Sequence, residues 1–347
     1  MDEQNEKTEL TPFSGKDETE FTANPLSESN EMDLTLFAEK VDRLRNAIGS
    51  VIVGQSRAVD LILSAILARG HVLLEGVPGV AKTLLAKMMA KLINADFSRI
   101  QFTPDLMPSD VLGTSVFNMK TSEFSFHPGP VFADIVLVDE VNRAPAKTQS
   151  ALFEVMEERQ ATIDGVLHPM SEIYTILATQ NPVEQEGTYK LPEAQLDRFM
   201  MKITIPYPSL TEEIEILERH NQNAQLAKLT DIAPVLTREE LLSMLGYVEK
   251  VYIEKSLLHY IASVIQQTRN SKAVFLGASP RASVALLQSS KAMALLQGRE
   301  FVTPEDIKMV APFVLQHRLI LTAEAEMEGH TPLKVVQRLI EKVEVPK

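Results

Sequence analysis

A short segment, residues 76–83, has the residue types and spacing of a loop that binds phosphate. Small residues let successive backbone N–H groups point toward one anion, and the start of a following helix adds unpaired N–H groups and a favourable dipole. Lys82 can then reach the β- and γ-phosphates, and the hydroxyl of Thr83 can bind Mg²⁺. The usual pattern has glycine where Ala81 stands, and alanine is compatible if that residue has a helical φ. The predicted nucleotide-binding residues here are Gly76, Val77, Pro78, Gly79, Val80, Ala81, Lys82, Thr83 and Leu84.

Two acidic residues, Asp139 and Glu140, follow the apolar run Ile135–Val138. An aspartate at such a position can hold Mg²⁺ through water, and a neighbouring glutamate can orient and deprotonate an attacking water molecule. Two acids after an apolar strand are commonplace, but at this interval after a phosphate loop they predict hydrolysis of ATP, with Thr83 and Asp139 as Mg²⁺ ligands. Asn181 ends the next strand pattern and can hydrogen-bond the γ-phosphate or the water, although Asn-Pro alone is a common turn.

The segments around these motifs alternate between strand and helix patterns. Ile135–Val138 is apolar on both faces, as expected for a central strand of a parallel sheet. A helix is predicted from about Lys82 to Leu92, directly after the phosphate loop. This alternation predicts an α/β fold with a doubly wound parallel sheet. The predicted strands cover residues 71–75, 97–103, 135–138, 173–178 and 201–205.

Strand patterns stop after Pro206, and signals for helix starts replace them. Thr237 with Glu240 has the spacing of a capping box, and Ser279-Pro280 puts a hydroxyl at an N-cap and proline at the first helical position. Two proline- and glycine-containing stretches interrupt the sheet domain and predict inserted β-hairpins. The predicted organisation is a tail at 1–33, an α/β core at 34–207 with hairpins near 104–130 and 160–170, and a helical domain at 208–347.

The net charge of −13 is concentrated at the N-terminus, because residues 1–33 hold ten acidic residues and two lysines. This tail is poor in branched apolar residues, so it is predicted to be disordered; a docking segment is the alternative. An acidic chain is a poor polyanion binder, which argues against nucleic acid. The chain has no cysteine, which excludes disulfides and thiolate metal sites, and its histidines are too scattered to predict a metal site.

The N-terminal residues lack the basic-then-apolar pattern of a signal peptide. No apolar run approaches the ~18 residues that a membrane helix needs. The expectation from these patterns is a cytoplasmic protein without a membrane span.

Together the motifs resemble those of AAA+ ATPases, and their exact residues are most similar to those of the MoxR family. Two strings are specific to that group: VDEVNRAP at residues 138–145 and EAQLDRF at residues 193–199. Shorter strings that agree are Val53-Gly54-Gln55, the phosphate loop with its alanine, ATQNP at 178–182 and Ser279-Pro280-Arg281. The resemblance covers about residues 35–345. It implies a five-stranded parallel sheet in the order 5-1-4-3-2 and a smaller all-helical lid domain.

The resemblance also implies roles for single residues. Val53 and Gln55 would lie in the loop that contacts adenine, and Asn181 would be the sensor beside the γ-phosphate. Arg198 matches the arginine finger that points into a neighbouring subunit's ATP site, where such a group can be worth ~10³–10⁵ in rate. Arg281 matches the second sensor in the lid, acting on its own or a neighbouring subunit's ATP.

At the level of the whole protein, the resemblance implies membership of the helix-2-insert clade, with hairpins that face the ring axis and the substrate. Family members are generally hexameric, and they often work with a partner that carries a von Willebrand factor type A domain. Two further arginines, Arg143 and Arg159, are expected to form ordinary salt bridges; a place at the subunit interface is the alternative for both.

Three hypotheses follow for the function. The first is an ATPase that remodels partner proteins or loads metal into them. The second is a nucleic-acid motor or transcription activator on the same fold. The hairpin at 104–130 argues against it, because it carries one lysine, Lys120, and no arginine, which is too little positive charge for nucleic-acid binding. The third is a nucleotide-gated scaffold without turnover, which only Ala81 suggests and which the intact Asp139, Glu140 and Arg198 oppose.

Overall fold

The computed structural model describes residues 34–120, 122–181, 191–221 and 232–346 of the 347-residue chain. The acidic tail 1–33, predicted from its sequence to be disordered, lies outside these described residues. No helix in the described ranges is both long enough and apolar enough to cross a membrane.

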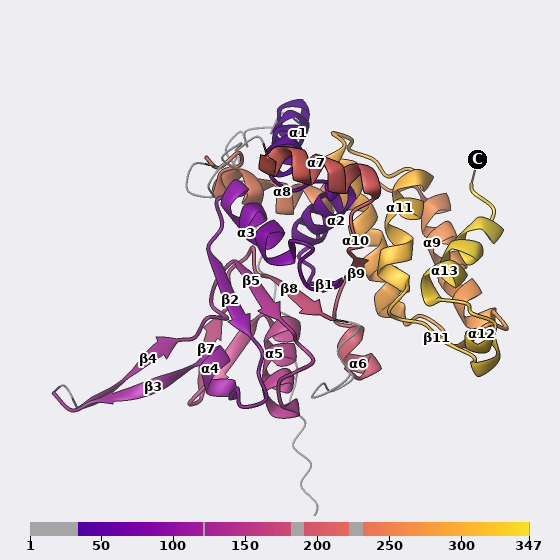
Figure 1. The fold of residues 1–347 in the computed structure, drawn as a ribbon. Helices are drawn as coiled ribbons and strands as arrows, with labels where there is room; N and C mark the ends of the chain where they lie inside the picture. The colour runs from indigo at the N-terminus through magenta and orange to yellow at the C-terminus, as the bar shows by residue number, and fades with distance from the viewer. Residues whose placement is uncertain (1–33, 121, 182–190, 222–231, 347) are drawn as a thin grey trace, which may run out of the picture. The chain divides into compact units, whose positions relative to one another are not determined.

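A five-stranded parallel sheet in the order β2-β5-β8-β1-β9 forms the centre of the structure (Figure 1). Counted along the chain, these five strands have the order 5-1-4-3-2, so the α/β fold implied by the resemblance is confirmed. Each strand begins and ends within two residues of its predicted position. The strands are β1 (Val72–Glu75), β2 (Phe97–Gln101), β5 (Ile135–Asp139), β8 (Thr175–Gln180) and β9 (Met201–Thr204).

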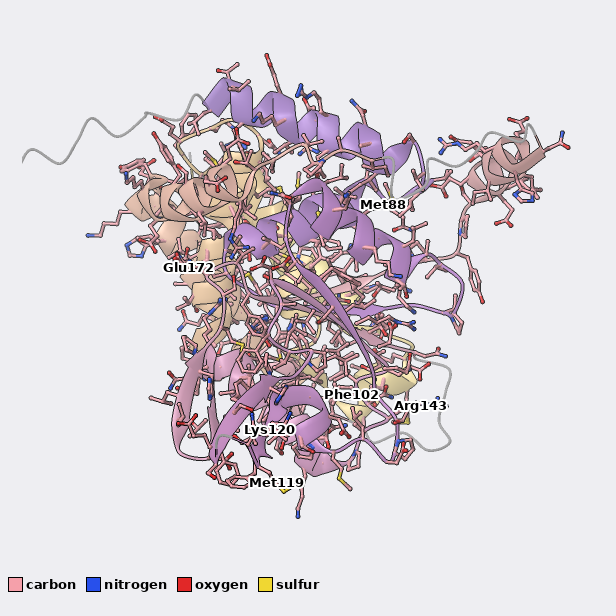
Figure 2. All side chains as sticks on the ribbon, turned by 90° about the vertical axis from the view of Figure 1, so that its left-hand side faces the viewer. Met88, Phe102, Met119, Lys120, Arg143 and Glu172 are labelled. Atoms are coloured by element: carbon pink, nitrogen blue, oxygen red, sulfur yellow. The ribbon has the colours of Figure 1, made fainter. Side chains whose placement is uncertain are left out.

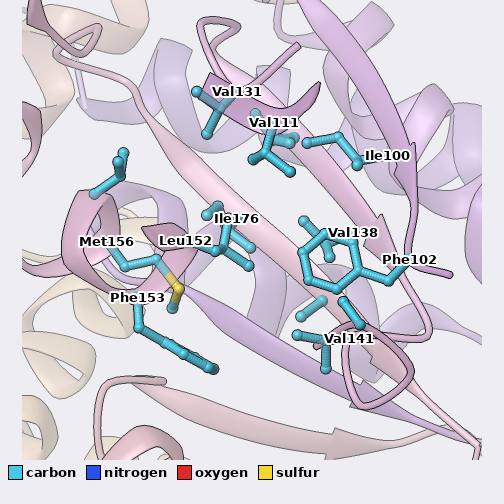
Figure 3. Close-up of a cluster of buried hydrophobic side chains, with 14 of the residues drawn as sticks. Ile100, Phe102, Val111, Val131, Val138, Val141, Leu152, Phe153, Met156 and Ile176 are labelled. Carbon is cyan, nitrogen blue, oxygen red and sulfur yellow. The ribbon is translucent and has the colours of Figure 1, made fainter. Parts of the chain in front are cut away.

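Strand β5 is buried along its whole length because helices cover both faces of the sheet. On one face, Val136 and Val138 belong to a cluster of buried apolar side chains that includes Leu152 and Phe153 of helix α5 (Ala146–Glu158) (Figure 3). Helix α3 (Lys82–Leu92) covers the opposite face and contacts β2 and β5 (Figure 1). Burying each such side chain contributes about 1.5–3 kcal/mol, so this packing holds the strand ends in place.

Two helices precede the sheet in the chain. Helix α1 (Leu34–Gly49) buries four apolar side chains at helical spacing and contacts α3. Helix α2 (Ser56–Leu67) contacts strand β9 and helix α10, which comes from the C-terminal half of the chain. The loop between α1 and α2 carries Val53 and Gln55.

Two antiparallel hairpins interrupt the alternation of strands and helices. The first pairs β3 (Gly113–Asn118) with β4 (Glu123–Pro128), follows the short helix α4 (Pro108–Leu112), and projects away from the sheet with Met119 and Lys120 at its tip (Figures 1 and 2). The second pairs β6 (Gln160–Ile163) with β7 (Val166–Pro169). Rings from the two hairpins stack, because Phe126 and His168 have ring centroids 4.1 Å apart.

Helices dominate the chain after β9. Thr237 and Glu240 form the predicted capping box at the start of α8, which holds that helix start in place. The division into a core at 34–207 and a lid at 208–347 stays a prediction. The helices are α6 (Glu193–Leu196), α7 (Leu210–Asn221), α8 (Arg238–Lys250), α9 (Lys255–Asn270), α10 (Pro280–Leu296), α11 (Pro304–Leu315), α12 (Ala323–Met327) and α13 (Pro332–Lys342).

The helical region departs from the sequence-based expectation in two details. It contains a small antiparallel ribbon of β10 (Val274–Leu276) and β11 (Ile320–Leu321), so it is not entirely helical. Strands of three and two residues are too short to produce a periodic pattern. Ser279 stands at the N-cap of α10 as predicted, but its hydroxyl donates to Asp197 Oδ2 (3.0 Å) instead of capping the helix.

A buried histidine links the first strand to the rest of the core. His71 Nε2 contacts the carbonyl oxygen of Met156 (3.1 Å), and the N–H of Ile176 donates to His71 Nδ1 (3.0 Å). Burial, assisted by the positive charge of Arg159, lowers the pKa of His71 to about 3. Burial likewise lowers the pKa of His317 well below its ordinary value, and the charge of Arg318 adds to this effect.

These histidines predict a loss of stability in mild acid. The unfolded chain protonates a histidine below about pH 6.5, whereas the folded chain keeps His71 neutral down to about pH 3. The free energy of unfolding should therefore fall by about 1.4 kcal/mol per histidine between pH 7.5 and pH 5.5. Urea denaturation at the two pH values measures this fall.

The variant His71→Gln should reduce that pH dependence by about 1.4 kcal/mol, because glutamine does not titrate. Ile176→Val is the matched control, since it lowers stability by about 1 kcal/mol without removing a titrating group. An equal pH dependence in His71→Gln and in the unchanged protein would contradict the assignment.

Candidate active site

The polar motifs meet at the edge of the sheet where the parallel strands β1, β5 and β8 end. In an open α/β sheet this edge is the usual place for a ligand. A cavity of about 390 Å³ lies there. Figure 2 shows Arg143 and Glu172 on opposite sides of the molecule. Arg143 follows the end of β5 and Glu172 precedes the start of β8, so the parallel strands end on the side where Arg143 lies. The cavity is lined by Pro78, Gly79, Ala81, Lys82, Thr83, Leu84, Arg99, Gln101, Asp139, Glu140, Thr179 and Asn181.

The phosphate loop joins β1 directly to α3. Gly79 has φ +90°, and a Cβ on Gly76 would lie 2.8 Å from the carbonyl oxygen of Ile205. Ala81 has φ +60°, so the sequence-based expectation of a helical φ at this alanine is wrong. The left-handed conformation costs an alanine roughly 1–2 kcal/mol. Glycine is the usual residue here because it adopts this conformation without that cost.

Lys82 begins helix α3, and its side chain folds back over the loop. Its ammonium group donates to the carbonyl oxygens of Gly76 and Val77, the latter at 3.1 Å. The positive charge therefore lies beside the backbone that would surround a phosphate chain. Val80 is buried in the core, so only its backbone is available to a ligand.

Asp139 ends β5 and is nearly buried. Its Oδ1 accepts a hydrogen bond from Thr179 Oγ1 (3.1 Å), and its Oδ2 accepts one from Arg99 Nε (2.6 Å). Both partners come from neighbouring strands, Thr179 from β8 and Arg99 from β2. The carboxylate is therefore fixed in orientation and balanced by one positive charge.

Glu140 has φ +57°, a left-handed conformation that is uncommon for glutamate and recurs at functional sites. Its N–H donates to Thr179 Oγ1 (3.0 Å), which stabilises this backbone. Its carboxylate oxygen Oε2 accepts from Gln101 Nε2 (2.9 Å) and from Arg143 Nη1 (3.0 Å). The expected salt bridge of Arg143 thus forms with the glutamate predicted to activate water.

The oxygen donors present suit Mg²⁺, which prefers one or two carboxylates, phosphate oxygens and water. Thr83 and Asp139 line the same cavity, and Arg99 places a cation against Asp139, so this carboxylate already accommodates positive charge. No group of three or more His, Asp or Glu side chains is arranged to hold a metal among the residues that the structure describes. A Mg²⁺ here would thus take most of its ligands from phosphate and water.

The loop predicted to contact adenine lies against helix α7. Val53 and Gln55 line a separate cavity of about 130 Å³, to which α7 contributes Glu215 and Arg219. Arg219 Nη1 donates to the carbonyl oxygens of residues 49 and 50, both at 2.9 Å. Helix α7 therefore closes over this loop.

The two predicted functional arginines lie apart from the phosphate loop. Arg198 and Arg281 line another cavity, of about 570 Å³, to which the phosphate loop contributes no residue among those described. Both interact with Glu157 at the end of α5. Arg159 lines the same cavity and donates to the carbonyl oxygens of Tyr174 and Arg69, and within the described ranges it forms no salt bridge.

Comparison with known proteins identifies the family. The family model described as ATPase family associated with various cellular activities (AAA) matches residues 71–201, and the AAA lid domain matches residues 266–339. Chaperone MoxR1 of Mycobacterium tuberculosis is 42% identical over 337 residues, which cover 94% of this chain and 88% of that protein. The chain belongs to the MoxR family of AAA+ ATPases.

Two other similar proteins match most of the chain. The uncharacterized protein YeaC of Bacillus subtilis is 47% identical over 299 residues, which cover 86% of this chain and 92% of YeaC. The crystal structure of a putative ATPase from Cytophaga hutchinsonii has a TM-score of 0.82 at 42% identity and covers 91% of this chain and 97% of its own.

Three residues of this MoxR-family site were missed from the sequence: Arg99, Gln101 and Thr179. Arg99 and Gln101 alternate along β2 and reach the two acids because Gln101 pairs in register with Asp139. The polar residues on either side of Ile100, at alternate positions of the predicted strand, were the one available signal. Thr179 lies in the string ATQNP that supports the resemblance, but nothing local gave it a role, because its hydroxyl binds groups about forty residues away.

The double hydrogen bond of Thr179 predicts a marked loss of stability on removal of its hydroxyl. Thr179→Val has nearly the same shape but leaves the Glu140 N–H and an Asp139 oxygen without their partner. The free energy of unfolding should fall by about 2 kcal/mol in chemical denaturation. Thr204→Val, at an exposed position of the same sheet, should change it by less than about 0.5 kcal/mol. Equal losses in both variants would show that Thr179 does not stabilise this corner.

Proposed function

We propose that this MoxR-family protein hydrolyses ATP at sites that two subunits of a ring share. The observation that carries this proposal is the separation of two sets of residues within one chain. The phosphate loop, Asp139, Glu140 and Asn181 gather around one cavity, while Arg198 and Arg281 line another. A single subunit thus presents an ATP site on one surface and a pair of arginines on another.

In the proposed reaction, the backbone N–H groups of residues 76–83 and the Lys82 ammonium bind the triphosphate. Mg²⁺, held by Thr83 and Asp139, would neutralise charge on the β- and γ-phosphates. Glu140 orients a water molecule and takes its proton as the water attacks the γ-phosphorus, while the bond from that phosphorus to the β-phosphate oxygen breaks and ADP leaves. Gln101 and Arg143 already contact Glu140 Oε2, so they would position this carboxylate toward the water.

Arg198 and Arg281 complete the proposed site from the neighbouring subunit. Each guanidinium would stabilise negative charge on the transferring phosphoryl group. We propose that both act in trans, because the two side chains share one counter-ion, Glu157. A hexamer is the ring size that the family resemblance favours.

Hydrolysis would drive chaperone-like remodelling of a partner protein. Support comes from the family and from the printed name of the Mycobacterium tuberculosis relative, a chaperone. The inserted hairpins β3–β4 and β6–β7, linked by the stack of Phe126 on His168, are the surfaces proposed to move. A partner with a von Willebrand factor type A domain, metal-cofactor insertion and a cytoplasmic location belong to the same proposal.

Glu140→Gln tests the role of the glutamate. This variant should still bind ATP, because Lys82 and the loop are intact, but its turnover should fall at least about 10³-fold. Lys82→Ala should instead lose ATP binding. Fluorescence titration with a labelled ATP and a phosphate-release assay separate the two effects. Turnover in Glu140→Gln at the wild-type rate would remove Glu140 from the proposed role.

Mixing two strongly impaired variants tests whether Arg281 acts in trans. Lys82→Ala subunits keep both arginines, and Arg281→Ala subunits keep the phosphate loop. If Arg281 acts on its neighbour, mixed rings contain complete sites, and turnover should recover to a substantial fraction of the wild-type rate. The same recovery is expected with Arg198→Ala. Phosphate release across a range of mixing ratios measures it.

The matched control mixes Lys82→Ala with Glu140→Gln, two changes in the same half-site. This mixture can form no complete site, so it should remain inactive at every ratio. Failure of Arg281→Ala to recover, while Arg198→Ala does recover, would mean that Arg281 acts on its own subunit's ATP.

A further inference from the structure

One carboxylate contacts both arginines of the proposed trans-acting pair. Glu157 Oε1 accepts a hydrogen bond from Arg281 Nη2, and Glu157 Oε2 lies 3.9 Å from Arg198 Nε. The three side chains come from three separate places: the last turn of α5, the turn after α6, and the first turn of α10. Glu157 therefore joins the sheet domain to the helical region at the point where the two arginines meet.

The contacts leave part of each guanidinium available. Arg281 uses Nη2 for Glu157, and within the described ranges its Nε and Nη1 have no acceptor. Arg198 directs Nε toward Glu157 and donates from Nη1 to the carbonyl oxygen of Phe153. An arginine presents five N–H donors in a rigid fork, so it can bind a carboxylate with one edge and a phosphate with another.

The backbone that carries Arg198 is itself firmly held. Arg318 is nearly buried and donates to Asp197 Oδ1 (2.7 Å) and to the carbonyl oxygens of Asp197 (3.0 Å), Phe199 (2.7 Å) and Met200 (3.0 Å). Ser279, two residues before Arg281, donates to the other oxygen of Asp197. The backbones at both arginines are thus fixed relative to each other, and Glu157 adds the contact at the guanidinium ends.

The positive charges of the arginines around this cavity also need a negative charge beside them. Five arginines line it, at positions 69, 159, 198, 281 and 318, and Arg318 is paired with Asp197. Without Glu157, Arg198 and Arg281 would repel each other across a partly exposed surface. Their side chains are 30% and 53% exposed, so each can swing away into solvent.

We propose that Glu157 is a positioning residue for ATP hydrolysis: it holds Arg198 and Arg281 side by side, so that both meet the triphosphate of a neighbouring subunit together. This inference rests on the proposed function. Because Glu157 acts through the arginines, its loss affects the rate of turnover and not the binding of ATP to the phosphate loop.

The test compares Glu157→Gln with Glu158→Gln, an adjacent exposed glutamate, in the assembled full-length protein. Glu157→Gln should lower kcat about tenfold, equivalent to ~1.4 kcal/mol, while KM for ATP and the assembly measured by light scattering change less than twofold. Glu157→Asp keeps the charge on a shorter side chain and should recover part of the rate. Glu158→Gln should match the wild type.

A double-mutant cycle separates positioning from a merely structural role. In an Arg281→Ala background, Glu157→Gln should cost less than about threefold, because half of what it positions is already absent. The same tenfold loss in both backgrounds would overturn the proposal, as would an unchanged or raised kcat in Glu157→Gln. If the wild-type protein itself shows no turnover, the proposed function fails; if the wild type turns over ATP and only these variants disagree, the positioning role alone fails.

Discussion

The candidate active site depends on the two hydrogen bonds that the Thr179 hydroxyl makes. This hydroxyl donates to the Asp139 carboxylate and accepts from the backbone N–H of Glu140, so one side chain of β8 fixes the two acids that end β5. The second bond holds Glu140 in a left-handed conformation, which turns its carboxylate toward Gln101 and Arg143. This arrangement needs β5 and β8 side by side in parallel register, and the two-sided burial of β5 provides that. The packing of Val136 and Val138 against α5 therefore helps to position the two acids.

The second organising contact lies between the sheet domain and the helices that follow it. Arg318 reaches from beyond α11 to the segment that carries Arg198, and Ser279 contacts the same Asp197 from the start of α10. Burial tends to lower the pKa of Arg318, and the hydrogen bond and charge of Asp197 oppose this effect. Buried polar groups thus lie between the sheet and the helices that follow it, and they fix the places of the two arginines.

Much of the fold follows from local sequence patterns. Strands β1 and β5 are visible as mainly apolar runs, and the phosphate loop is visible because its residues are consecutive. The contacts of Arg99, Gln101 and Thr179 are not visible, since they depend on strand register between segments about forty residues apart. The positive φ of Ala81 was mispredicted because a helix-compatible alanine carries no mark of left-handed backbone. Arg198, Arg281 and Glu157 come together because of the way α10 packs. The position of α10 cannot be predicted from the sequence of any one segment.

The four hydrogen bonds from Arg318 to residues 197–200 have a mechanical consequence. A hinge at this junction would have to break all four at once, and the Arg318 side chain that makes them is nearly buried. Residues 197–200, which carry Arg198, and the segment around Arg318 are therefore expected to move together. In the proposed ring, a movement that starts at the phosphate loop would therefore carry Arg198 and Arg318 together and would change how neighbouring subunits are oriented.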